Sequence, residues 1–154
     1  MTTVWTIGHS THTFQKFLAL LRKYDIQIVI DVRRKPYSHY VPQANRETLK
    51  RNLEGEGIGY QWQGAYLGGG FGGRADYEEL RSKPGFAPAI AKVLALAQTQ
   101  RVALMCSEGK HTRCHRHELL APAIIEQGAR VIHIQPDGSY VVETEIAPEQ
   151  LTLL

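Results

Sequence analysis

Short runs of apolar and β-branched residues recur along the chain, and such runs predict strands that are covered on both faces. The most continuous is "IQIVIDV", which is nearly all β-branched and apolar. Strands are predicted at Val4–Gly8, Ile26–Val32, Ile58–Trp62, Arg101–Cys106 and Ala129–Ile134.

Between these runs the apolar positions change to a helical spacing. Phe14, Phe17 and Leu21 recur every three or four residues, which predicts an amphipathic helix. Pro88 suits the first turn of a later helix, whereas Pro122 lies inside the last one, where we expect a kink or an early break. Helices are predicted at Thr13–Tyr24, Arg46–Glu54, Ala89–Gln98 and Thr112–Gln127.

This alternation of strands and helices predicts a single α/β domain over residues 1–154, with a mostly parallel sheet flanked by helices. A Pro-Asp-Gly turn at 136–138 leads to a last strand, which we expect to return as an antiparallel hairpin. The segment Gly68–Gly73 is predicted to be a loop. It is not a dinucleotide-binding fingerprint, because its glycines do not directly follow the first strand.

Composition and charge narrow the function classes. The chain has 154 residues, of which 43% are hydrophobic and 21% charged, as in one domain with a full core. No apolar run approaches the roughly 20 residues that a membrane helix needs, so we expect no membrane partner. Two cysteines and a first segment without signal-peptide features predict a cytoplasmic protein with free thiols. A net charge of +3 permits a phosphate-bearing or nucleic-acid partner without requiring one.

Polar and chemically active side chains follow four of the predicted strands. Because the carboxyl ends of parallel strands meet at one edge of a sheet, where α/β proteins bind ligands, we expect these groups to converge. They are Gly8-His9-Ser10, Asp31-Val32-Arg33, Cys106-Ser107-Glu108 and His133 through Gln135.

Some of these residues also have a structural interpretation. One of Ser10, Thr11 and Thr13 is expected to cap the first helix. Asp31 and Arg33 lie two positions apart and therefore on one face of a strand, so Asp31 can serve to orient Arg33.

Five separated motifs, in this order along nearly the whole chain, resemble those of the family catalogued as domain of unknown function 488. They are "TIGHS", "DVR" followed by Pro36 and Ser38, "YLGG" (66–69), Cys106-x-Glu108 and Cys114-His115-Arg116. The resemblance implies no particular reaction. It does imply motif positions for His9, Ser10, Asp31, Arg33, Gly68, Gly69, Cys106, Glu108, Cys114, His115 and Arg116.

The loop from Cys106 to Arg116 is compatible with several kinds of chemistry. A zinc or iron site would use Cys106, Cys114 and His115, but the cysteines are farther apart than structural zinc sites usually place them. A nucleophile loop would put the Cys106 thiolate before a helix N-terminus, although Glu108 then brings negative charge to an anion site. A buried, inert Cys106 is the structural alternative.

Anion binding needs no covalent chemistry. Arginines such as Arg33, Arg113 and Arg116 can clamp a phosphate through two parallel hydrogen bonds. Aromatic residues in the neighbouring loops can stack on bases. They are Tyr37, Tyr40, Trp62, Tyr66 and Phe71.

The sequence hypothesis is therefore an enzyme-like site at the carboxyl edge of the sheet that takes a phosphate-bearing ligand, either a nucleotide or a nucleic acid. A non-catalytic nucleic-acid-binding module and a Cys/His metal site are the alternatives, and catalysis, cofactor and oligomeric state are left open. The predicted catalytic residues are Cys106, Glu108, His9 and Asp31. The predicted ligand-binding residues are Ser10, Arg33, Tyr66, Gly68, Gly69, Cys114, His115 and Arg116.

Overall fold

The computed structural model describes residues 1–68, 74–109 and 119–143. The six strands in these ranges form one sheet in the order β3-β2-β4-β1-β5-β6. All neighbouring pairs are parallel except β5 and β6, which form the predicted antiparallel C-terminal hairpin. The strands are β1 (Thr3–Gly8), β2 (Ile28–Asp31), β3 (Gly59–Trp62), β4 (Val102–Cys106), β5 (Arg130–Ile134) and β6 (Tyr140–Glu143).

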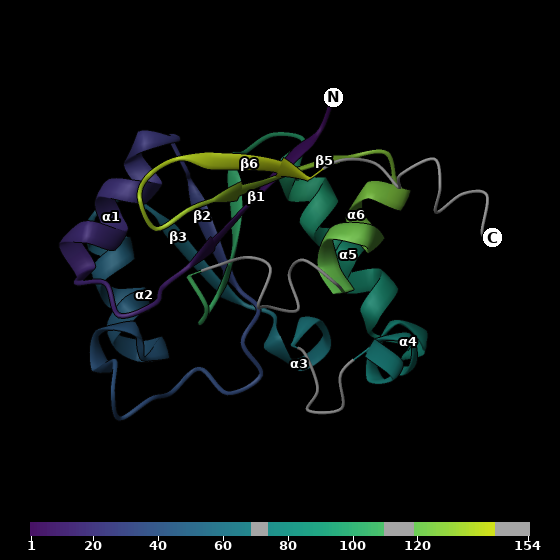
Figure 1. Ribbon diagram of the computed structural model, residues 1–154, viewed down its shortest axis with the longest axis horizontal. Coiled ribbons are helices and arrows are strands. Elements are labelled where there is room, and N and C mark those ends of the chain that lie inside the picture. The colour runs from purple at the N-terminus through teal and green to yellow at the C-terminus, as the bar shows by residue number, and fades with distance from the viewer. Residues whose placement is uncertain (69–73, 110–118, 144–154) are drawn as a thin grey trace.

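Helices cover both faces of this sheet, which confirms the predicted α/β class. Figure 1 shows α1 and α2 on one side of the sheet and α4, α5 and α6 on the other. The helical elements are α1 (Phe14–Lys23), the 3₁₀ turn η1 (Pro42–Ala44), α2 (Arg46–Gly55), α3 (Gly64–Leu67), α4 (Arg74–Ser82), α5 (Phe86–Ala97) and α6 (Ala121–Glu126). None of the helices in the described ranges is long and apolar enough to cross a membrane.

Alternate residues of the four inner strands, β1, β2, β4 and β5, contribute to two separate cores. Ile30, Leu104 and Cys106 pack with α5 and α6, whereas Val29 and Met105 pack with α1 and α2. This follows from the strand period of two, which sends neighbouring side chains to opposite faces. The position of a polar residue along its strand, odd or even, therefore also decides which of the two cores it lies beside.

One predicted helix cap and the surroundings of Pro122 can be compared with the structure. Thr13 caps α1, because its Oγ1 accepts a hydrogen bond from the Lys16 N–H at 3.1 Å. Helix α6 begins at Ala121 with Pro122 as its second residue, and the two residues before the helix, Leu119 and Leu120, form a π-helical turn, so the regular helix is interrupted next to this proline. The first part of the predicted helix 112–127 lies outside the described residues.

Helices α3 and α4 were not predicted. They lie on either side of the glycine-rich segment 68–73, where only a loop was predicted. Helix α4 packs Tyr77 and Leu80 against the core formed with α5 and α6, so tertiary contacts stabilise a helix that has only a weak apolar pattern.

Candidate functional site

A cleft of about 280 Å³ lies at the carboxyl edge of the sheet. Its walls come from three segments that follow β1, β2 and β4, as expected for a ligand site in an open α/β sheet. The lining residues are His9, Ser10, Thr11, Arg33, Lys35, Tyr37, Ser38, Val41, Ser107, Glu108 and Gly109. Four predicted site residues, His9, Ser10, Arg33 and Glu108, are therefore brought together.

Backbone hydrogen bonds continue the pairing of β1 with β4 past the strand ends and hold two of these walls together. The His9 N–H donates to the Cys106 carbonyl and the Ser10 N–H to the Ser107 carbonyl, both at 2.9 Å. Gly8 permits this approach, because a Cβ at Gly8 would lie 1.7 Å from the Glu108 carbonyl oxygen. Ser10 then turns the chain with a φ of +48°, a left-handed conformation that is uncommon outside glycine.

Arg33 is the most firmly held side chain of the cleft. Its Nε and Nη2 donate to the two Asp31 carboxylate oxygens at 2.9 and 2.7 Å, in the bidentate geometry typical of arginine and carboxylate. Nη2 also donates to the Ala44 carbonyl at 2.8 Å. Asp31 is fully buried and Arg33 is 6% exposed, so the pair is fixed in one orientation.

A tyrosine that sequence reasoning missed completes this network. The Tyr60 hydroxyl, from β3, donates to Asp31 Oδ2 at 2.5 Å. Burial raises the pKa of Tyr60, and the neighbouring Asp31 charge raises it further, so the hydroxyl keeps its proton. Tyr60 pairs in register with Val29, and the sequence gives no signal for that pairing.

Trp62 also acts on the loop after β2, although it was predicted only as a stacking aromatic. Its Nε1 donates to the Arg33 carbonyl at 2.8 Å, and the Arg46 guanidinium lies 4.8 Å from the ring centroid. Gly64, just beyond β3, lets the chain pass this carbonyl, because an added Cβ would lie 1.8 Å from it. These contacts fix the backbone from which Lys35, Tyr37 and Ser38 reach the cleft.

His9 is neutral at physiological pH. Burial, together with the smaller effect of the Arg33 charge, lowers the pKa of His9 from 6.5 to about 4, against the opposing effects of the Ser10 carbonyl and Asp31. Its Nδ1 lies 2.7 Å from the Ser10 carbonyl oxygen, which can only accept a hydrogen bond. Nδ1 therefore carries the ring proton, and Nε2 is left as a proton acceptor.

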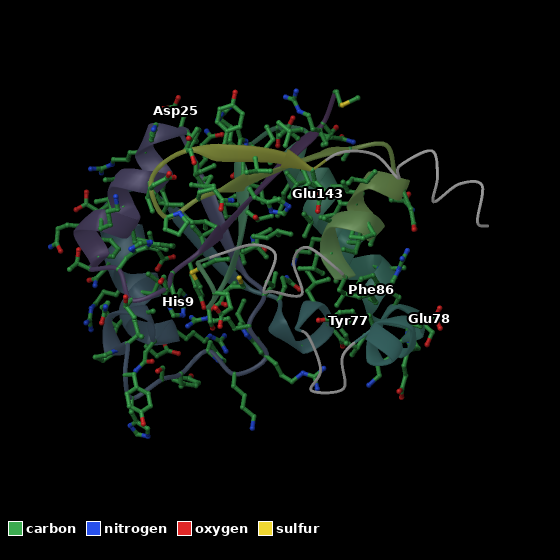
Figure 2. All side chains as sticks on the ribbon, viewed as in Figure 1. His9, Asp25, Tyr77, Glu78, Phe86 and Glu143 are labelled. Carbon is green, nitrogen blue, oxygen red and sulfur yellow. The ribbon has the colours of Figure 1, made fainter. Side chains whose placement is uncertain are left out.

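Figure 2 shows His9 on the side of the molecule that carries α1 and α2, with Tyr77 and Phe86 on the opposite side. Asp31 follows Ile30 and so shares the face of Val29, the same side of the sheet. Cys106 is buried on the other face, packed with Ile30, and its Sγ lies 3.5 Å from the Glu108 carbonyl.

This position suits packing for Cys106, and the sulfur does not line the cleft. The loop that follows it includes Cys114, His115 and Arg116, together with Arg113, and these residues lie outside the described ranges. The reactive-thiol hypothesis therefore stays a prediction. Among the described residues no three His, Cys, Asp or Glu side chains are grouped so as to hold a metal ion.

The remaining predicted residues lie elsewhere or are not described. Tyr66 is on α3, exposed, with its ring against the Gly85 backbone. The Gly68 carbonyl accepts from Arg34 Nη2 at 3.4 Å, and Gly69 lies outside the described residues. His133 lies within β5 rather than at its end, and its Nδ1 is 2.6 Å from Thr6 Oγ1 in the sheet interior.

Sequence reasoning identified the loop after β2 as basic and aromatic but did not single out Lys35 as a residue of the site. Ser107 was among the groups expected to converge at this edge, and Ser38 belongs to a family motif, but neither was assigned a role in the site. The lining residues that were missed are Thr11, Val41 and Gly109. For Thr11, Ser107 and Gly109 the available signal was position, because each lies within three residues of the end of β1 or β4, whereas Val41 lies well beyond the end of β2 and carried no such signal.

Comparison with known proteins adds a family. A family model described as "Domain of unknown function DUF488" matches residues 13–121. The match includes Asp31, Arg33, Cys106 and Glu108, and the segment "TIGHS" precedes it. No curated protein and no solved structure matches the chain. Because the matched residues make up well over half of its length, the chain belongs to the family described as Domain of unknown function DUF488.

Proposed function

We propose that the cleft binds a phosphate-bearing ligand. The observation that carries this proposal is the way Arg33 is held. Asp31 and the Ala44 carbonyl engage Nε and Nη2, and Nη1 has no hydrogen-bond partner among the described residues. Arg33 lines the cleft, and Nη1 is the part of its guanidinium that remains to bond a ligand oxygen.

The other groups around the cleft suit a phosphate as well. Lys35 contributes a second positive charge, and five hydroxyl side chains contribute donors. These hydroxyls belong to Ser10, Thr11, Tyr37, Ser38 and Ser107. Glu108 is the one carboxylate among the lining residues, and it is exposed, so water screens its repulsion of an anion.

His9 and Glu108 are the acid–base groups of this proposal. The His9 ring has an unprotonated Nε2 and can take a proton from a ligand hydroxyl or a water. A bound phosphate would offset the Arg33 charge and raise the pKa of His9, which makes the ring a better base once the ligand is in place.

A nucleic-acid contact is the second candidate, and one observation favours it. The loop after β2 exposes Arg34, Lys35, Tyr37, His39 and Tyr40 within seven residues. Interleaved cations and aromatic rings are typical of surfaces that bind single strands. The salt dependence of oligonucleotide binding separates the two candidates, because contacts to several phosphates release several counterions.

The experiment is a calorimetric titration of the protein with inorganic phosphate and with adenosine 5′-monophosphate. We expect binding that weakens at least tenfold in Lys35→Ala and is unchanged in Lys92→Ala, an exposed lysine on α5 away from the cleft. Arg33→Lys keeps the charge but loses the planar fork, and it should also weaken binding. Equal affinities in wild type, Lys35→Ala and Arg33→Lys, or no binding at all, would reject the proposal.

A further inference from the structure

We propose that the ligand is a phosphomonoester whose phosphate is linked to an aromatic ring system, with the phosphate at Arg33 and the ring against Tyr37. This inference rests on the proposed function and narrows it. The same chemistry occurs in a free nucleoside monophosphate and at the 5′-phosphorylated end of a single strand.

The depth of Arg33 favours a terminal phosphate. Arg33 is 6% exposed, and Asp31, Tyr60 and Ala44 hold it below the rim. An internal phosphodiester carries a nucleoside on each side, so its phosphate can reach only donors that stand at the surface. A monoester has a free end that can enter first and place its oxygens against Nη1.

The number of hydrogen-bond donors in the cleft also favours a phosphomonoester. A monoester presents three terminal oxygens and a diester presents two. The cleft offers the Nη1 group of Arg33 together with the hydroxyls of Ser10, Ser38 and Ser107. A donor set of this size can engage all three terminal oxygens of a monoester.

Tyr37 supplies the ring contact. It lines the cleft and is still 61% exposed, so one part of its side chain borders the cavity while most of it lies at the mouth. A cleft of about 280 Å³ is at the small end for ligand sites, so a nucleotide would be enclosed only in part. The base would then lie outside the phosphate pocket, at the level where Tyr37 can stack on it.

Tyr40 provides a matched control from the same loop. It is 95% exposed but is not among the residues that line the cleft. A general preference of this loop for aromatic ligands would involve both tyrosines, whereas a ligand bound in the cleft would contact Tyr37 alone. Both side chains are exposed, so neither Tyr37→Ala nor Tyr40→Ala removes core packing.

The test compares three probes by calorimetry: ribose 5-phosphate, adenosine 5′-monophosphate and the dinucleotide ApA without a terminal phosphate. We expect adenosine 5′-monophosphate to bind about tenfold tighter than ribose 5-phosphate, and ApA to bind at least tenfold more weakly than adenosine 5′-monophosphate. Tyr37→Ala should abolish the difference between the first two probes, because it removes the ring on which the base stacks. Tyr40→Ala should retain the difference.

The outcomes separate this inference from the proposed function. If ribose 5-phosphate binds but the base adds nothing, if ApA binds as well as the monophosphate, or if the two tyrosine variants behave alike, this inference is wrong and the proposed function stands. If no phosphate probe binds, both fail. A 5′-phosphorylated single strand that binds at least tenfold tighter than adenosine 5′-monophosphate identifies a strand end as the ligand, and one that binds more weakly identifies the free nucleotide.

Discussion

The hydrogen bond from Tyr60 to Asp31 gives a prediction that can be worked through from the structure. Tyr60→Phe removes one hydroxyl and keeps the ring that packs in the core with α1 and α2. Asp31 retains three donors from Arg33, namely the backbone N–H, Nε and Nη2, so the carboxylate is not left bare.

A buried hydrogen bond to a charged group contributes about 1.5–3 kcal/mol. Because three donors remain on Asp31, we expect the lower end of this range, about 1.5–2 kcal/mol of lost stability. In a domain of this size each kcal/mol shifts Tm by about 2–4 °C, so the variant should melt roughly 3–8 °C below the wild type.

The assay is thermal and urea unfolding followed by circular dichroism, with Tyr140→Phe as the matched control. Tyr140 lies on β6 and is exposed, so its hydroxyl should matter by less than about 0.5 kcal/mol. If Tyr60→Phe is as stable as Tyr140→Phe, the hydrogen bond contributes nothing and our account of how Arg33 is positioned is refuted.

Three further predictions concern the cleft. Gly8→Ala places a Cβ 1.7 Å from the Glu108 carbonyl and must displace that loop, so we expect a loss of about 1–3 kcal/mol in urea unfolding, while Gly55→Ala, with open space around it, should show no such loss. The lowered pKa of His9 means that the unfolded chain binds a proton from about pH 6.5 downward and the folded protein only near pH 4. Stability should therefore fall by up to about 3 kcal/mol as pH drops through this window, and His9→Gln should flatten that part of the curve; an identical pH profile in the variant contradicts the assignment. Glu108→Gln removes a negative charge from the rim and should strengthen phosphate binding by about threefold in calorimetry, whereas weaker binding would mean that the carboxylate contacts the ligand as an acceptor.

The elements that could be predicted from the sequence are those whose signal is local. The apolar run Ile26–Val32 and the helical spacing of Phe17 and Leu21 are signals of this kind. The structure has a strand inside the first, Ile28–Asp31, and helix α1 over the second. Helices α3 and α4 lack such a signal because glycine is frequent around them, and they are held by packing from distant residues.

The residues of the candidate site also fall into two groups, those with a local signal in the sequence and those that depend on strand pairing. His9, Arg33 and Glu108 could be predicted because each follows a strand, and parallel strands bring their carboxyl ends to one edge. Tyr60 could not be predicted, because its bond to Asp31 depends on which strand lies beside β2 and in which register. The burial of Cys106 on the opposite face is likewise a matter of strand parity, which becomes visible only when the core residues of both faces are known.

The strand order also affects how the protein folds during its synthesis. Strands β1 and β2 are made early, yet they are not neighbours, because β4 lies between them and pairs with both. Until residues 102–106 leave the ribosome, the inner edges of both strands lack their native partner. The contacts that join the segments after β1, β2 and β4 span up to about a hundred positions, so their formation carries the loop-closure cost of distant contacts. The cleft is therefore expected to form in a single late step of folding, so a nascent chain that ends before β4 should lack it.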